Sequence, residues 1–205
     1  MEEKERIIGV PPHPLPWPED DRYDKTLLAE GDKRNVLDKY RYWTNEAIVA
    51  DLDTQRTGLH IAVENWQHDF NIGTIVRNAN AFNVAAVHII GKRQWNKRGA
   101  MVTNRYLHVA HHAEVAQFVR AMQHENRAIV AIDNLEGAEL LSNAELPESC
   151  VLVFGGEGPG LSEAIVAASS HLVAIEQFGS TRSVNVGVAS GIVMYEWMRR
   201  HVLNR

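Results

Sequence analysis

From residue 58 onward, short apolar runs alternate with segments that have the hydrophobic spacing of helices. The apolar runs lack polar alternation, as expected of strands covered on both faces, and occupy residues 58–64, 84–91, 127–133, 150–156 and 171–176. Helical spacing is found in residues 70–82, 113–126, 160–170 and 183–203. Strands that alternate with helices predict an α/β fold in which a parallel sheet is flanked by helices on both faces.

The first 57 residues have a different character. Residues 11–18 (PPHPLPWP) hold five prolines in eight positions, which predicts an extended arm rather than a core element. Residues 24–51 predict one or two polar helices, broken near Gly31. We therefore expect an N-terminal extension over residues 1–57 and one α/β domain over residues 58–205.

The composition narrows the class of protein. Hydrophobic residues make up 45% of the 205 positions, which is enough for a packed core. No apolar run is long enough to span a bilayer, and the acidic start of the chain lacks the apolar region of a signal peptide. The single cysteine, Cys150, cannot form an internal disulfide, and we interpret it as a buried side chain. We expect a cytoplasmic protein with no membrane partner.

The distribution of charge is more informative than the net charge of −5. Residues 70–112 contain no acidic residue, but they hold the six basic residues Arg77, Lys92, Arg93, Lys97, Arg98 and Arg105. A local positive field of this kind inside an acidic protein suits a phosphate backbone. The alternative is a solvated surface on which basic residues cluster by chance.

Three groups of polar or glycine residues follow predicted strands, where ligands gather in parallel sheets. The first is residues 70–82 (FNIGTIVRNANAF), a helix with one apolar stripe that also carries an arginine and three asparagines. Asn71 stands where the helix should begin and can cap it. Gly73 lies one turn before Arg77, so it can leave room for a ligand to reach the guanidinium. The structural alternative is a capping asparagine and a surface arginine.

The second group is residues 153–165 (VFGGEGPGLSEAI), in which a strand ends in glycines and a helix follows. Such glycines let a small molecule approach the backbone, although a tight strand-to-helix turn would also need them. The segment is neither a Walker loop nor a dinucleotide fingerprint, which disfavours a dinucleotide oxidoreductase. In the third group, Ser183 and Asn185 open a helix rich in small residues, and Ser183 is placed to act as its N-cap.

Taken together in this order, the three groups resemble the motifs of the SpoU/TrmH-type RNA ribose 2′-O-methyltransferases of the SPOUT superfamily. The matching segments are residues 71–77 (NIGTIVR), 154–162 (FGGEGPGLS) and 183–197 (SVNVGVASGIVMYEW), and the resemblance covers roughly residues 58–203. It implies an α/β fold with a deep C-terminal trefoil knot, S-adenosylmethionine bound in that knot, and a homodimer. The RNA is transfer RNA or ribosomal RNA, and we favour transfer RNA because the chain is compact.

The resemblance also implies roles for residues at the matching positions. The catalytic positions are Asn71, Arg77, Glu157, Ser183 and Asn185, and the cofactor is held around Gly155, Gly156, Ile175, Val184 and Asn185. Two positions depart from the family pattern: Gly156 stands where Asn is common, and Glu176-Gln177 where Pro-Met is common. The basic residues Lys92, Arg93, Lys97, Arg98 and Arg105 would then bind RNA, while Trp95 and Tyr106 either stack on its bases or pack locally.

The role of Arg77 needs a physical interpretation, because a guanidinium stays protonated in proteins and makes a poor base. We expect Arg77 to grip a phosphate and to stabilise the alkoxide that develops on the ribose. An enzyme is favoured over a non-catalytic RNA-binding or ribosome-assembly protein because the five motif residues Asn71, Arg77, Glu157, Ser183 and Asn185 are intact. A SPOUT base methyltransferase, the other alternative, would not need the motif arginine. His108, His111 and His112 have no cysteine or carboxylate at ligand spacing, so we expect no metal.

Overall fold

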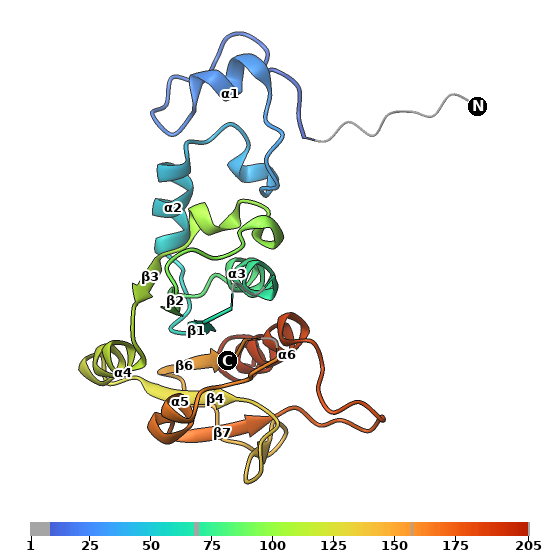
Figure 1. Ribbon diagram of the computed structural model, residues 1–205. Coiled ribbons are helices and arrows are strands. Elements are labelled where there is room, and N and C mark those ends of the chain that lie inside the picture. The colour runs from blue at the N-terminus through green and yellow to red at the C-terminus, as the bar shows by residue number, and fades with distance from the viewer. Residues whose placement is uncertain (1–8, 68–69, 157, 205) are drawn as a thin grey trace. The chain divides into compact units, whose positions relative to one another are not determined.

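The chain divides into two compact units, Met1–Gln55 and Arg56–Arg205, and Figure 1 shows their helices and strands. The computed structural model describes residues 9–67, 70–156 and 158–204. The first unit contains helices α1 (Lys25–Glu30) and α2 (Asn45–Asp53), with a 3₁₀ turn at Asp38–Tyr40 between them. The predicted break near Gly31 is confirmed, because Gly31 ends α1 with a φ of 90°.

The proline-rich segment is attached to the rest of the first unit by hydrogen bonds. The backbone amide of His13 donates to the carbonyl of Leu28 (2.8 Å), and the Tyr42 hydroxyl donates to the carbonyl of Pro11 (2.6 Å). Residues 11–18 have no helix or strand, as the prolines predict. The arm therefore has no regular secondary structure, bends at Leu15 and Pro16, and packs on its own unit.

The second unit carries a parallel sheet flanked by helices, which confirms the predicted fold class. The described strands are β1 (His60–Asn65), β2 (Ala86–Gly91), β3 (Val109–His112), β4 (Ala128–Ile132), β5 (Glu139–Leu140), β6 (Cys150–Phe154) and β7 (His171–Ala174). The helices are α3 (Asn71–Ala81), α4 (Val115–His124), α5 (Glu163–Ala168) and α6 (Val186–Met198), and a π-helical segment, Arg199–Leu203, continues α6. Two short 3₁₀ turns, Arg98–Ala100 and Thr103–Tyr106, lie between β2 and β3.

The strands lie in the order β3-β2-β1-β6-β4-β7-β5, and every neighbouring pair is parallel. The first three strands, β1, β2 and β3, lie side by side in chain order toward one edge of the sheet. The remaining four strands lie on the other side of β1, so the direction in which strands are added changes between β1 and β6. Such a switch point leaves an opening at the carboxyl ends of the strands. The pattern did not predict β3 or β5, which are short and lie at the edges of the sheet.

The two faces of the sheet have separate cores, as strands covered on both sides require. On one face, α3 and α6 cover alternate strand residues such as Ile61, Val63 and Leu152. On the other face, α4 and α5 cover Ala62 and Val153 with side chains that include Phe118, Met122 and Ile165. Figure 1 shows the two pairs of helices on opposite sides of the strands.

Three histidines form a hydrogen-bonded chain across neighbouring strands on the α4 face. His60 Nδ1 lies 3.0 Å from His88 Nε2, and His88 Nδ1 lies 3.0 Å from His112 Nε2. Phe118 of α4 packs edge-on against the rings of His88 and His112. Each contact needs one donor and one acceptor nitrogen, so the chain is satisfied when all three rings are neutral.

Burial lowers the pKa of His88 to about 3 and that of His60 to about 4, each from an ordinary value of 6.5. Arg127 opposes protonation of His60 further, while Glu125 partly favours it; burial also lowers the pKa of His112. A histidine with a lowered folded-state pKa binds its proton more readily when the chain unfolds. The stability that these residues contribute is therefore complete above about pH 6.5 and is lost as the pH falls toward 4.

We predict that acidification from pH 7 to pH 5 lowers the free energy of unfolding of the second unit by about 2 kcal/mol for each of His60 and His88. Urea unfolding at the two pH values measures this change. His88→Gln should remove much of the acid-sensitive part, whereas the same change at the exposed His124 should leave it intact. An equal acid-dependent loss in the His88 variant would contradict the prediction.

Candidate active site

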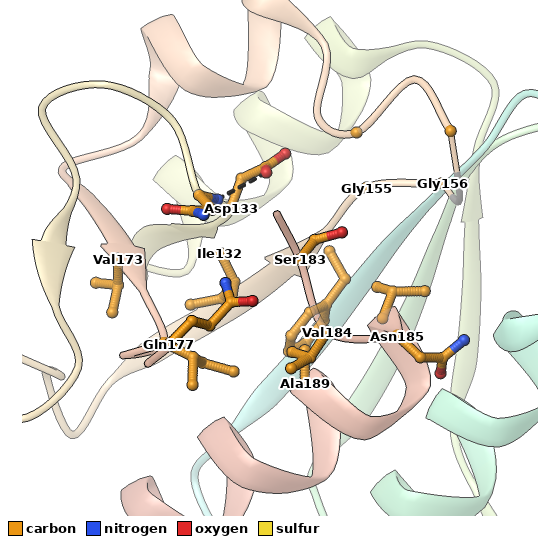
Figure 2. A pocket seen from close by; sticks show the side chains of 16 residues that line it. Ile132, Asp133, Gly155, Gly156, Val173, Gln177, Ser183, Val184, Asn185 and Ala189 are labelled. Atoms are coloured by element: carbon orange, nitrogen blue, oxygen red, sulfur yellow. Dashed lines mark hydrogen bonds between the residues drawn. The ribbon is translucent and has the colours of Figure 1, made fainter. Parts of the chain in front are cut away.

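A pocket of about 380 Å³ opens at the carboxyl ends of three neighbouring strands, β6, β4 and β7, and at the start of α6 (Figure 2). This volume lies in the ordinary range of small-molecule sites, about 300–1,000 Å³. The pocket is lined by Ile132, Asp133, Asn134, Phe154, Gly155, Gly156, Gly158, Gly160, Val173, Ile175, Gln177, Ser183, Val184, Asn185, Val186 and Ala189. The five residues for which the family resemblance implies cofactor binding are all in this set.

The loop after β6 folds back on itself to form one wall of the pocket. The amide of Gly160 donates to the carbonyl of Gly156 (3.1 Å), and the two residues form an isolated antiparallel bridge. A Cβ added at Gly155 would lie 2.2 Å from the carbonyl carbon of Gly160 and 2.5 Å from the amide of Leu161. Gly155 is therefore required by contact with its own loop, and the result is a backbone surface exposed to the pocket.

Polar side chains from β4 and from the segment after β7 also line the pocket. Asp133 accepts hydrogen bonds from the amides of Asn134 (2.7 Å) and Leu161 (3.0 Å), so it fixes the glycine loop to the end of β4. The carbonyl of Arg182 accepts from Asn134 Nδ2 (2.8 Å) and Gln177 Nε2 (3.3 Å). Figure 2 shows Asp133, Gln177 and Ser183 around the pocket. The sequence analysis missed Asp133 and Asn134, although they are polar residues directly after a predicted strand, like the other candidate site residues.

Two asparagines from distant motifs meet beside the pocket. Asn185 Nδ2 donates to Asn71 Oδ1 (3.0 Å), while Asn185 Oδ1 accepts from the amides of Gly187 (3.0 Å) and Val188 (3.3 Å). Asn185 is therefore the N-cap of α6, and the prediction of Ser183 in that role is wrong. Asn71 is the first residue of α3 and does not cap it, so that prediction is also wrong. Both side chains are used to join α3 to α6.

Asn78 strengthens the same junction between α3 and α6. Its Nδ2 atom donates to the carbonyl of Gly187 (2.9 Å) and lies 3.0 Å from Ser190 Oγ. A Cβ at Gly187 would lie 2.9 Å from the methyl group of Thr74, so a small residue is needed where the helices meet. The side-chain amides of Asn71 and Asn78 therefore interrupt the apolar pattern of α3 because they bind α6.

Arg77 is exposed on α3 and is not part of the pocket lining. The expectation that Gly73 leaves room for a ligand is wrong, because its space is taken by the chain itself. A Cβ at Gly73 would lie 2.8 Å from the amides of both Gly99 and Ala100. Residues 91–108, called the basic segment below, therefore pack across the first turn of α3 through Gly99 and Ala100. Glu157 lies outside the described residues, so its predicted role has no structural counterpart here.

The basic segment exposes the residues predicted to bind RNA. Lys92, Arg93, Lys97, Arg98 and Arg105 are all exposed. The aromatic residues between them behave differently: Tyr106 is buried, and Trp95 packs partly against the core of the α3 face. The stacking interpretation is wrong for Tyr106, and local packing explains it.

The departures from the family pattern do not block the pocket. Glu176 is absent from the lining, and its Oε1 atom accepts from the amide of Ser142 (2.9 Å). Hydrogen bonding to Ser142 holds the pKa of Glu176 below its ordinary value. Gln177 lines the pocket but is committed to the carbonyl of Arg182, and Gly156 contributes backbone. In the described ranges, no group of His, Cys, Asp and Glu is arranged to hold a metal ion, and no helix is long and apolar enough to cross a membrane.

Comparison with known proteins gives a consistent result. The family model described as "SpoU rRNA Methylase family" matches residues 58–195. A 23S rRNA (guanosine-2′-O-)-methyltransferase of Neisseria meningitidis is 25% identical over 87% of this chain and 78% of its own length. Several other curated relatives are longer, and this chain covers less than two thirds of their length.

Solved structures share the fold. The A. aeolicus TrmH/SpoU tRNA modifying enzyme superposes with a TM-score of 0.68 at 22% identity, over 78% of this chain and 83% of that one. An AdoMet-bound rRNA methyltransferase from Sinorhizobium meliloti superposes with a TM-score of 0.65 at 23% identity, over 75% of this chain and 60% of that one.

Proposed function

The chain belongs to the SpoU rRNA Methylase family, and on this premise we propose that it transfers a methyl group from S-adenosylmethionine to a ribose 2′-hydroxyl of RNA. The observation that carries the proposal is the Asn71–Asn185 hydrogen bond (3.0 Å), which joins the first and third motifs beside the glycine-walled pocket. The substrate is transfer RNA or ribosomal RNA, and the reaction takes place in the cytoplasm.

The pocket fits S-adenosylmethionine in size and in the kind of groups that it offers. Backbone of the loop at Gly155 and Gly156 is approachable, while Ile175, Val184 and Ala189 add an apolar wall suited to an adenine ring. Asp133 and Gln177 provide polar atoms at the edges. When bound, S-adenosylmethionine supplies an electrophilic methyl group on a sulfonium.

Arg77 acts on the RNA side of the reaction. The guanidinium remains protonated, binds the phosphate next to the target nucleotide through two parallel hydrogen bonds, and stabilises the negative charge that develops on the 2′-oxygen. The proton of the hydroxyl passes to a phosphate oxygen or to water. The Asn71–Asn185 hydrogen bond fixes the first turn of α3 beside the pocket. Ser183 lines the pocket, where it can orient the ribose.

The C-terminal segment adopts the deep trefoil knot of the family in this proposal. The support is that the chain leaves β7 on one half of the sheet and returns in α6, which is hydrogen-bonded to α3 next to the other half. A knotted segment would hold the loop after β7 and the loop after β6 together around the cofactor.

A second copy of the chain covers the outer face of α6. Trp197 and Val193 are buried in the core of their own unit, but Val188 (55% exposed), Ile192 (39%) and Tyr195 (54%) are not. These three side chains line a groove between α3 and α6. An apolar face that remains after the sheet has been covered is typical of a symmetric interface.

We predict that Ile192→Arg converts a dimer into monomers of about half the mass, because it would place an unpaired charge in the interface. Sedimentation at micromolar concentration measures the change. Val109→Arg, at an exposed apolar residue of the edge strand β3, is the matched control and should leave the dimer intact. A monomeric wild-type protein with full activity would refute the dimer.

The direct test of the cofactor site is calorimetry with S-adenosylhomocysteine. We expect binding to the free protein with an affinity in the micromolar range, because the pocket is formed before RNA arrives. A folded protein that fails to bind the ligand at millimolar concentration would overturn the proposed function.

A further inference from the structure

Trp66 follows β1 directly and has no part in the three motifs or in the pocket. Trp66 is 39% exposed, whereas Trp95, the tryptophan within residues 70–112, packs partly against the core. Trp66 is therefore an aromatic side chain that stays accessible at the carboxyl edge of the sheet, where ligands bind in parallel sheets.

The ring of Trp66 is held in one orientation by two supports. Its Nε1 atom donates to Glu64 Oε1 (2.9 Å), and Glu64 is fully buried. The other oxygen of Glu64 accepts from the amide of Ser162 (2.7 Å), the N-cap of α5 just after the glycine loop. On the second side, the ring lies against Gly91: an added Cβ there would be 2.7 Å from Trp66 Cε3. The ring is thus pre-organised, and little entropy would be lost if it bound a partner.

The same region positions two basic side chains. The amide of Lys92 donates to the carbonyl of Asn65 (2.9 Å), and Asn65 Nδ2 donates to the carbonyls of Lys92 (2.7 Å) and Gln94 (2.9 Å). Asn65 is buried, whereas Lys92 and Arg93 are exposed. The end of β1 therefore fixes an aromatic ring through Glu64 and a basic loop through Asn65, at neighbouring positions.

We propose that Trp66 is a stacking platform for a nucleobase of the RNA, with Lys92 and Arg93 on the adjacent phosphates. This inference rests on the proposed function, because it assigns part of the substrate site. The partner is RNA rather than a protein because residues 70–112 carry six basic residues and no acidic one. A rigid ring next to cationic side chains is the arrangement by which proteins hold single-stranded nucleic acid without reading its sequence.

The test compares two fluorescent probes, a twelve-nucleotide riboadenosine oligomer and an abasic ribose-phosphate oligomer of the same length. Anisotropy titrations give their affinities for the full chain. Trp66→Leu keeps apolar bulk but removes stacking, so it should weaken binding of the riboadenosine oligomer by about 5- to 100-fold. It should not change binding of the abasic oligomer, and Trp66→Phe should retain most of the affinity.

The salt dependence separates stacking from phosphate contacts. Trp66→Leu should leave the slope of log affinity against log salt unchanged, whereas the double variant Lys92→Gln/Arg93→Gln should reduce it by about 1.4. Calorimetry with S-adenosylhomocysteine on each variant reports on the fold and on the cofactor site, and only variants that bind it like the wild type are compared.

Three outcomes would overturn the stacking site: equal affinities of wild-type and Trp66→Leu protein for riboadenosine, an equal loss for both oligomers, or no binding of either oligomer by the wild type. If the wild type still binds S-adenosylhomocysteine in those cases, the proposed cofactor site stands. If the wild type does not bind S-adenosylhomocysteine, the proposed function itself fails.

Discussion

Arg77→Ala is expected to reduce methyl transfer by about 10²- to 10³-fold, while S-adenosylhomocysteine binds with an affinity within a few-fold of the wild-type value. The reason is the location of the side chain. Arg77 is exposed on α3 and does not line the pocket, so its loss removes a contact to the RNA and to the developing alkoxide without changing the cofactor site. Single-turnover methylation and calorimetry on the same preparation measure the two effects.

Arg77→Lys provides the sharper version of this test. Lysine keeps the positive charge, but a point charge on a flexible stem cannot reproduce the two parallel hydrogen bonds of a guanidinium. The lysine variant should therefore be nearly as inactive as the alanine variant. Arg120→Ala is the matched control, because Arg120 is also exposed but lies on α4, on the opposite face of the sheet. Near-normal turnover by Arg77→Lys would show that charge alone is sufficient.

The second large effect is expected at Gly155. A methyl group there would meet backbone atoms of Gly160 at 2.2–2.4 Å, and backbone cannot move aside as a flexible side chain can. Gly155→Ala should push the loop away from β4, break the contact between Asp133 and the Leu161 amide, and lower the affinity for S-adenosylhomocysteine by about 10- to 100-fold.

Gly179→Ala is the control for Gly155→Ala, because no atom lies within 4 Å of a Cβ placed at Gly179 in the loop after β7. It should bind S-adenosylhomocysteine like the wild type. Calorimetry gives the affinities, and thermal unfolding shows whether the Gly155 variant keeps its fold. Unchanged affinity in a folded Gly155→Ala protein would mean that the glycine loop is not the wall of the cofactor site.

The sheet and its covering helices could be predicted because burial on both faces leaves a clear pattern. Cys150–Phe154 and Ala128–Ile132 are continuous apolar runs, and both are central strands. The edge strand β3 was missed, since VAHH is short, half exposed and polar. His112 of β3 is held by a hydrogen bond with His88 of β2, which in turn contacts His60 of β1. Contacts between strands that are distant in the sequence do not change the local spacing of hydrophobic residues, so that spacing could not predict them.

The candidate site was predicted in its location but not in its details. Polar residues after strands correctly predicted a pocket at the carboxyl edge of the sheet. Local rules failed where a side chain has a distant partner: Asn71 was expected to cap α3, yet it accepts a hydrogen bond from Asn185, 114 positions away. Gly73 was expected to admit a ligand, yet Gly99 and Ala100 occupy its space. The functional roles of Arg77, Ser183 and Asn185 remain predictions.

The most direct test of the central proposal is a search for the reaction product. The protein would be incubated with S-adenosylmethionine carrying a ¹³C-methyl group and, separately, with unfractionated transfer RNA and ribosomal RNA. Digestion to nucleosides and mass spectrometry would then locate the label, with Arg77→Lys as the negative control. We expect a ¹³C-labelled 2′-O-methylnucleoside from one class of RNA and none with the variant. Label on a base, or RNA binding without any transfer, would contradict the assignment as a ribose methyltransferase.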